Sequence, residues 1–520
     1  WVDPRLRPFQ IDNGDPLGYT RCSRAGLIYF YNNDESYARM FRDLALNTNL
    51  IAGSDHYHSH MHALIWDLIE ESPVFSDADR RAITAKLLQH ARGADGTAGR
   101  AGIFNYPEDK YMLDRHNSMR ANCFLTESRY FNKYWPAEEW QQNLAAVKRY
   151  FNRQMTNGKG GSDLGGRGIY SYLECVLIPM QLLHDRRFID SGALRHYADL
   201  NVMHCDNLGY MPDTGQNSPT SYPVYTLMKS ATFLNDGSYL EPLAIRERGE
   251  RIGGFAVTTE EYTAGQAWAT GLHAKLPEKM LGLYSLPLTR WEWEILGRSI
   301  PIEKSLDKLT LRSGFGRDDQ YLLFDGLHGQ PFEKPHPDVN AILHFTQYGR
   351  PILVDDGGSS TTEHGVVSLS REVFGQEGGR VASLEAHANL PRFGYFQSRA
   401  AAHSFSQWDR HLFWRKGKWF VTIDRLKMKA AGNYSLECNW RPVGFPQIHG
   451  SEFIATQGSG EANDPRLAIH IVNAEQLPLR CNEISSTNLS RFGGKPERTP
   501  ISRVRQVISR QMPAGQENIF

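Results

Sequence analysis

Apolar positions recur at helical spacing through the first 300 residues of the chain. Residues 77–91 carry apolar side chains behind an acidic start, and residues 135–155 repeat the pattern with Pro136 suited to a first helical turn. Residues 169–183 and 191–203 follow as another pair. Helices that alternate with loops over this length predict a helical hairpin array. The absence of a fixed short repeat favours a closed or incomplete toroid over a regular solenoid.

The pattern changes near residue 300 to short runs in which apolar and polar residues alternate. Glycine, aspartate and asparagine turns separate these runs, as in an antiparallel sandwich. Gly417, between two tryptophan-bearing runs, predicts a hairpin turn. We therefore predict an α+β multidomain protein: an N-terminal (α/α) incomplete toroid over residues 1–300, then an antiparallel β-sandwich over 301–520. The predicted strands include 320–324, 341–348, 351–354, 410–414, 419–424, 434–440 and 468–472.

The composition is that of a globular protein and excludes several functional classes. Hydrophobic residues make up 40% of the chain, and 58 basic residues balance 58 acidic ones. The balanced net charge therefore gives no overall positive potential that would attract nucleic acid. No apolar run approaches the roughly 20 residues that span a bilayer. The six cysteines show no metal-ligand spacing, so we expect thiols. The start at Trp1 rather than Met suggests a processed or trimmed N-terminus. We expect a periplasmic or secreted protein.

Two polar clusters in the helical half are candidates for binding an anionic substrate. His56, His58, His60 and His62 fall within seven residues. Of these, His58 and His62 would be neighbours on a helix and could contact a substrate or hold a metal. The alternative is a set of exposed or internally bonded histidines. The second cluster offers cationic and amide donors that suit a carboxylate, although a helix start would also expose them. Its members are Arg115, His116, Asn117 and Arg120.

A glycine-rich loop that contains Arg167 leads into an apolar stretch with two tyrosines, Tyr170 and Tyr172. The positive end of a helix dipole stabilises a phenolate, so either tyrosine could move a proton. The alternative is that both pack against a neighbouring helix.

The β half contains a histidine and a carboxylate at comparable ends of two predicted strands. His336 precedes the first of these strands, Asp355 ends the second, and His364 follows in the next loop. Two histidines and an aspartate suit zinc, whereas the alternative is ordinary polar loop residues.

Residues 311–440 resemble the heparinase II/III-like polysaccharide lyases. The resemblance rests on the run that opens at Leu311, on His336-x-Asp338, and on the Gly-x-Pro-x-Leu-Val-Asp stretch that ends at Asp355. It continues in the paired strands around Trp408 and Trp419. The family resemblance implies a toroid followed by a β-sandwich, in agreement with the division read from the pattern, and cleavage of uronic-acid polysaccharides by β-elimination.

The resemblance also implies roles for single residues. His116 and Asn117 match the pair that contacts the uronate carboxyl, Tyr170 or Tyr172 the proton-transferring tyrosine, and His336 the histidine that faces the cleft. His336, Asp355 and either His364 or His403 match a structural metal site, for zinc or calcium. No organic cofactor is expected; the expected partner is an anionic uronate polysaccharide or oligosaccharide, with a homodimer as an open alternative.

Two other functions stay open at this point. An (α/α)-toroid glycoside hydrolase would use a pair of carboxylates for acid and base catalysis. A non-catalytic glycan-binding protein would stack sugars on its aromatic loops without turnover. The carboxylates considered for the hydrolase are Asp55, Asp67, Asp163 and Glu174.

Overall fold

The contacts of the chain divide it into two compact units. Unit 1 holds Trp1–Gly160 with Ser171–Ser191, and unit 2 holds Gly161–Tyr170 with Gly192–Phe520. Helices give way to strands near residue 300, inside unit 2. The computed structural model describes residues 18–47, 61–92, 103–105, 115–157, 176–209, 224–248, 272–327, 339–355, 365–371, 375–377, 380–401, 405–450, 452–457, 466–470, 479–484 and 500–520.

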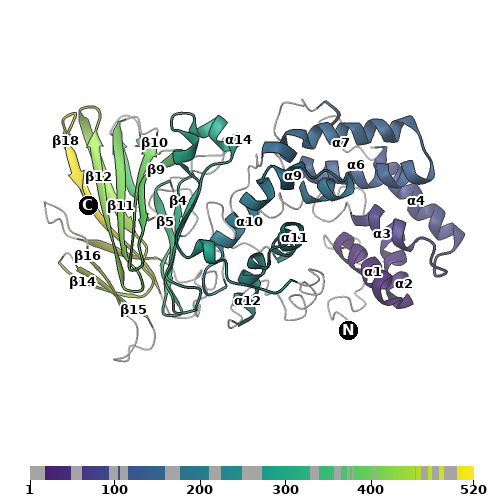
Figure 1. The fold of residues 1–520 in the computed structure, drawn as a ribbon, viewed down its shortest axis with the longest axis horizontal. Helices are drawn as coiled ribbons and strands as arrows, with labels where there is room; N and C mark the ends of the chain where they lie inside the picture. The colour runs from purple at the N-terminus through teal and green to yellow at the C-terminus, as the bar shows by residue number, and fades with distance from the viewer. Residues whose placement is uncertain are drawn as a thin grey trace. The chain divides into compact units, whose positions relative to one another are not determined.

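Unit 1 is helical and packs around aromatic side chains. The ring of Trp66 stacks on Phe41 at 5.9 Å between centroids and meets Phe75 edge-on at 5.1 Å. Ser76 caps α4 in a capping box with Asp79, which confirms the helix predicted over 77–91. The helices α6 and α7 lie side by side (Figure 1). The described helices are α1 (Gly18–Asn32), α2 (Glu35–Asn47), α3 (Met61–Ile69), α4 (Asp77–Ala91), α6 (Arg115–Tyr134), α7 (Glu138–Asn157) and α9 (Arg187–Asp190).

Unit 2 begins with helices that share a core with the first strands. Buried side chains of α10 to α12 pack with Met280, Leu286 and Leu327. The longer helical elements are α10 (Ala193–His204), α11 (Val224–Leu234), η3 (Gly237–Leu240) and α12 (Glu241–Arg248). The short ones are η4 (Glu278–Met280), α14 (Arg290–Glu292), η5 (Trp293–Gly297) and η6 (Ile302–Lys304).

The strands of unit 2 form antiparallel sheets around one large core. Sheet A has the order β1-β3-β4-β5-β6, with β1 (Gly282–Leu286), β3 (Lys308–Arg312), β4 (Tyr321–Asp325), β5 (Ala341–Gln347) and β6 (Arg350–Val354). Sheet B has the order β19-β12-β11-β10-β9-β2, with β2 (Ser305–Leu306), β9 (Val381–Asn389), β10 (Phe393–Ala401), β11 (Ser406–Arg415), β12 (Trp419–Met428) and β19 (Glu517–Ile519). Sheet C has the order β17-β18-β13-β7-β8, with β7 (Val367–Arg371), β8 (Gly375–Glu377), β13 (Gly432–Trp440), β17 (Arg480–Ile484) and β18 (Ile501–Met512). Sheet D has the order β14-β15-β16, with β14 (Phe445–His449), β15 (Glu452–Thr456) and β16 (Arg466–His470).

The β11–β12 hairpin confirms the predicted turn. Gly417 has φ +71°, a left-handed conformation that glycine adopts without strain. Arg415 pairs with Trp419 across the turn, and the register continues to Ser406 and Met428. The long neighbouring strands of sheet B run side by side (Figure 1).

Arg312 of β3 binds the C-terminal end of α10. Arg312 is 1% exposed, and its guanidinium donates to Asn207 Oδ1 at 2.5 Å and to the carbonyl of Cys205. It also lies 4.3 Å from the ring centroid of Tyr321. The last carbonyls of a helix have no partner within the helix and carry partial negative charge, so a buried guanidinium satisfies both needs.

Two further strands of sheet A reach the same helix end. The hydroxyl of Tyr321 on β4 donates to the Met203 carbonyl at 2.6 Å, and burial holds the pKa of this phenol well above its usual range. The ring of His344 on β5 lies 3.0 Å from Asp206, Nε2 to Oδ2, and both side chains are buried. Three adjacent strands thus fix the end of α10, which explains why residues after 191 belong to the same unit as the sheets.

The described cysteines are free thiols, as the spacing predicts. Four of them are buried, and Cys481 is partly exposed. No helix among the described residues is long and apolar enough to cross a membrane. The other members of the described set are Cys22, Cys123, Cys205 and Cys438.

Replacing Arg312 by Met should destabilise unit 2. The carbonyl of Cys205 and the amide oxygen of Asn207 would lose their donor inside the protein, at a cost of about 3 kcal/mol. Urea unfolding followed by circular dichroism should show an earlier transition for Arg312→Met, with Arg317→Met in the neighbouring exposed turn as the control. Equal unfolding midpoints for the two variants would contradict the assigned role.

Candidate functional site

The described part of α6 begins at the donor cluster that the sequence predicts. Arg115, His116 and Asn117 occupy its first turn, and Arg120 follows with a partly exposed side chain. The side chains of the first three lie outside the described set. Backbone N–H groups at a helix start are unpaired and carry partial positive charge, which favours a carboxylate ligand nearby.

Buried polar side chains fix α6 against its neighbours in unit 1. A hydrogen bond joins Glu127 to His90 of α4, with Oε1 and Nδ1 2.5 Å apart. Both side chains are 5% exposed. Asn143 of α7 donates to Ser128 Oγ at 3.1 Å. Because such directional contacts leave little freedom to slide or rotate, α6 presents its first turn in one orientation.

Of the remaining predicted site residues in the helical half, the structure describes His62. His62, in α3, is 6% exposed and lines a small cavity with Cys22, Trp66 and Lys86. Its contact with a substrate stays a prediction, and its burial fits packing in the core of unit 1. The predicted residues outside the described set are His56, His58, His60, Arg167, Tyr170 and Tyr172, together with His336, His364 and His403 of the β half.

Among the carboxylates considered for a hydrolase, Asp67 is described. Its Oδ1 accepts from Lys133 Nζ and from the Tyr134 hydroxyl, each at 2.7 Å. An ion-paired carboxylate held by two donors favours a structural role at the surface of unit 1. Asp55, Asp163 and Glu174 lie outside the described residues.

In unit 2, the chain segments next to the predicted metal ligands come together beside β5. Asp355, 1% exposed, directly follows β6, whose Val354 pairs with His344 of β5. Gly365, the residue after His364, packs so closely that a Cβ there would lie 2.8 Å from the Ile342 carbonyl oxygen. The described residues that flank the predicted ligands His336, Asp355 and His364 therefore lie close to one another beside β5.

One guanidinium joins two of these loop ends. Arg410 Nη1 donates to the carbonyl of Asn340 at 2.7 Å and to the carbonyl of Gly365 at 2.9 Å. Asn340 lies four residues after His336, so the two loops with predicted histidine ligands share this anchor. Arg410 in turn donates to both carboxylate oxygens of Asp424, at 2.7 and 2.9 Å. A two-point Arg–carboxylate pair fixes the plane of the guanidinium as well as its position.

The donor set suits zinc more than calcium. Two imidazoles and one carboxylate are common zinc ligands, whereas calcium prefers oxygen alone. Within the described residues no three metal-binding side chains form a cluster, and Asp355 is the one predicted ligand they include. The metal site stays a prediction.

The Arg410–Asp424 pair is a part of the site that sequence reasoning missed. Both residues stand seven positions from Gly417, so a hairpin centred on that glycine places them opposite each other. The sequence does not indicate that these two residues are buried, because charged residues are rarely buried inside a sheet. The sequence signal was therefore the hairpin symmetry rather than residue type.

Comparisons with known proteins identify the fold. No protein-family profile and no curated protein matches the chain. Among solved structures, it is similar to the heparan sulfate lyase HepC from Pedobacter heparinus, with a TM-score of 0.55 and 13% identity over 97% of this chain and 75% of that one. A structure of heparinase III gives a TM-score of 0.57 at 12% identity, covering 99% and 78% of the two chains. A heparinase III with methylated lysines gives 0.60 at 12% identity with the same coverage.

At 12–13% identity this likeness establishes the fold and no more. It covers nearly the whole chain and thus both the helical part and the sheets. The predicted α+β architecture, a helical toroid followed by an antiparallel β-sandwich, is confirmed.

Protein purified without added metal should contain about one zinc ion per chain, because a His–His–Asp set binds zinc tightly. His336→Ala should remove the metal and lower the melting temperature, whereas His387→Ala, at an exposed histidine of β9, should change neither. Elemental analysis and thermal unfolding with and without a chelator measure both effects. A metal-free wild-type protein whose stability His336→Ala leaves unchanged would rule out the site.

Proposed function

We propose that this protein is a polysaccharide lyase that cleaves a uronic-acid-containing polysaccharide by β-elimination. The observation that carries the proposal is the likeness of fold over 97–99% of the chain to structures described as a heparan sulfate lyase and as heparinase III. Fold alone does not fix activity, so the residues must supply the chemistry. The donor cluster at the start of α6 supports the proposal, since a lyase needs such donors for a carboxylate.

The first requirement is to stabilise negative charge on the substrate carboxyl. The C5 proton of a uronate is weakly acidic, and its removal leaves an enolate-like anion. We assign His116 and Asn117 to this carboxyl, with Arg115 and Arg120 as further cationic donors. These residues lie within two turns at the start of α6, and the buried contacts of Glu127 hold that helix in place.

The second requirement is proton transfer. A base removes the C5 proton, and an acid protonates the leaving oxygen at C4. We assign the transfer to Tyr170 or Tyr172. Such a role requires a partner that stabilises the phenolate, for which Arg167 is the candidate, because an ordinary tyrosine with a pKa near ~10 is a poor base at neutral pH. His336 is assigned as a further catalytic residue, and the histidines at 56, 58 and 60 to substrate contact.

The metal and the location of the enzyme belong to the same proposal. Zinc bound by His336, Asp355 and His364 or His403 would have a structural role and hold the loop that faces the substrate. A periplasmic or secreted location suits a polymeric substrate. Heparan sulfate is the first substrate to test, with alginate, ulvan and glucuronan as the alternatives.

Replacing the catalytic tyrosine by Phe should lower turnover by ~10²-fold or more, the effect of losing general acid–base catalysis. The substitution removes one hydroxyl, so the fold should survive. Tyr170→Phe and Tyr172→Phe are each compared with Tyr31→Phe, an exposed tyrosine of α1, by the near-ultraviolet absorbance of the unsaturated uronate product. The substrate is the one that a panel of uronate polysaccharides shows to be cleaved fastest.

Asn117→Ala in the same assay should also slow turnover, because the intermediate loses a donor. Rates equal to wild type for both tyrosine variants would exclude them as the base. An absence of unsaturated product from every polysaccharide of the panel would overturn the lyase proposal itself.

A further inference from the structure

The outer face of sheet B carries a cross-strand array of apolar side chains. Tyr395 of β10, Phe413 of β11 and Val421 of β12 are direct neighbours in the register, and Phe393 and Trp419 form the next row with Arg415 between them. The rings of Tyr395 and Phe413 are 4.8 Å apart. Side chains that alternate with these point inward to the core. Because successive side chains of a strand point to opposite faces of the sheet, the apolar residues gather on the outer face.

This face is open and hollowed. Phe393, Phe413, Trp419 and Val421 are 43–47% exposed, and they line a shallow groove of about 460 Å³ with Leu390. Isolated exposed apolar residues are ordinary, but a contiguous group of this kind marks a surface that binds something. The aromatic members offer flat faces onto which a ring can stack.

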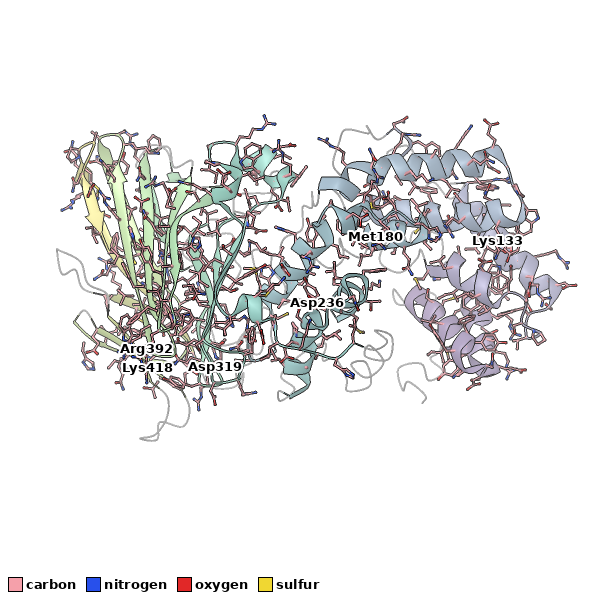
Figure 2. The ribbon with its side chains drawn as sticks, in the orientation of Figure 1. Lys133, Met180, Asp236, Asp319, Arg392 and Lys418 are labelled. Carbon is pink, nitrogen blue, oxygen red and sulfur yellow. The ribbon has the colours of Figure 1, made fainter. Side chains whose placement is uncertain are left out.

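Four cationic residues lie in or beside the two adjacent turns at one end of these strands. Lys416 N–H donates to the Arg392 carbonyl at 3.1 Å, which fixes the β9–β10 turn beside the β11–β12 turn. Figure 2 shows Arg392 and Lys418 at the same end of the sheet. None of the four forms an ion pair with any described residue. The set comprises Arg392, Arg415, Lys416 and Lys418.

The described acidic groups near this face already have partners. Glu385 and Asp409 contact Arg399, and Glu517 pairs with Arg425. The neighbouring turn holds Asp319, whose carboxylate accepts from the Gly316 N–H at 2.8 Å. These acidic groups therefore do not neutralise the four cations. An occupant with its own negative charges fits the face better.

We propose that this face is a second, non-catalytic binding site for an anionic uronate polysaccharide. Sugar rings would stack on Phe413 and Trp419 with their C–H faces, while carboxylate or sulfate groups would lie against Arg392 and Lys418. The inference rests on the proposed function for its choice of polymer. A site of this kind holds the long substrate near the enzyme between cleavages and raises its effective concentration.

Affinity electrophoresis at low temperature through gels that contain heparan sulfate, alginate or neutral dextran tests the proposal. Wild-type protein should be retarded by a uronate polymer and not by dextran. Trp419→Ala and the double variant Arg392→Glu/Lys418→Glu should each bind that polymer roughly fivefold more weakly or worse, the effect of losing an aromatic contact or a charge pair. All these positions are exposed, so the fold should survive.

Matched controls are Phe445→Ala, an exposed aromatic residue of sheet D, and Arg298→Glu, an exposed arginine far along the chain from both turns. Neither should alter retardation. Turnover of a short soluble oligosaccharide should stay unchanged in every variant, because none touches the assigned catalytic residues.

The outcomes separate the two proposals. Weaker retardation without any lyase product supports the glycan site and removes the catalytic function. Unsaturated product with unchanged retardation in both variants overturns the glycan site and leaves the lyase standing. Retardation of wild type by none of the polymers also overturns the site. So does a wild-type dimer in analytical ultracentrifugation that Trp419→Ala converts to monomer, since a second copy would then cover the face.

Discussion

A helix that ends inside a protein leaves its last carbonyl oxygens without N–H donors, and unit 2 is organised around one such end. The C-terminus of α10 meets Arg312, Tyr321 and His344, one side chain from each of three neighbouring strands. These contacts fix both the position of the helix and its rotation, because each is directional. The helical segment after residue 191 is consequently part of the β unit, although its secondary structure resembles that of unit 1.

Arg410 likewise satisfies backbone carbonyls next to the start of β5. A buried guanidinium, oriented by Asp424, holds the carbonyls of Asn340 and Gly365. Burying an ion pair carries a desolvation penalty, and hydrophobic residues often give equal stability, so such a pair is better understood as fixing geometry. Here the pair fixes the backbone at Asn340 and Gly365. The predicted metal ligands His336 and His364 shortly precede these residues in the chain.

The sequence predicted the elements with strong periodicity and turn chemistry and could not predict long-range polar contacts. The helix over 77–91 and the hairpin at Gly417 follow from local rules, namely a cap and a glycine turn, and both are confirmed. The contact of Arg312 with Cys205 spans more than a hundred residues, and nothing in the local pattern around either residue indicates the other. The candidate catalytic residues were proposed through a family resemblance, and their geometry stays a prediction.

The toroid-and-sandwich fold is confirmed, whereas the lyase chemistry is proposed. The mass balance of the products tests that chemistry most directly. β-Elimination breaks the glycosidic bond without adding water, whereas a hydrolase adds one molecule of water for each bond broken. A defined uronate oligosaccharide is incubated with the protein, and the products are weighed by mass spectrometry. The proposal predicts two products whose masses sum to that of the substrate, with the unsaturated ring on the new non-reducing end. A sum that exceeds the substrate by one water would contradict it.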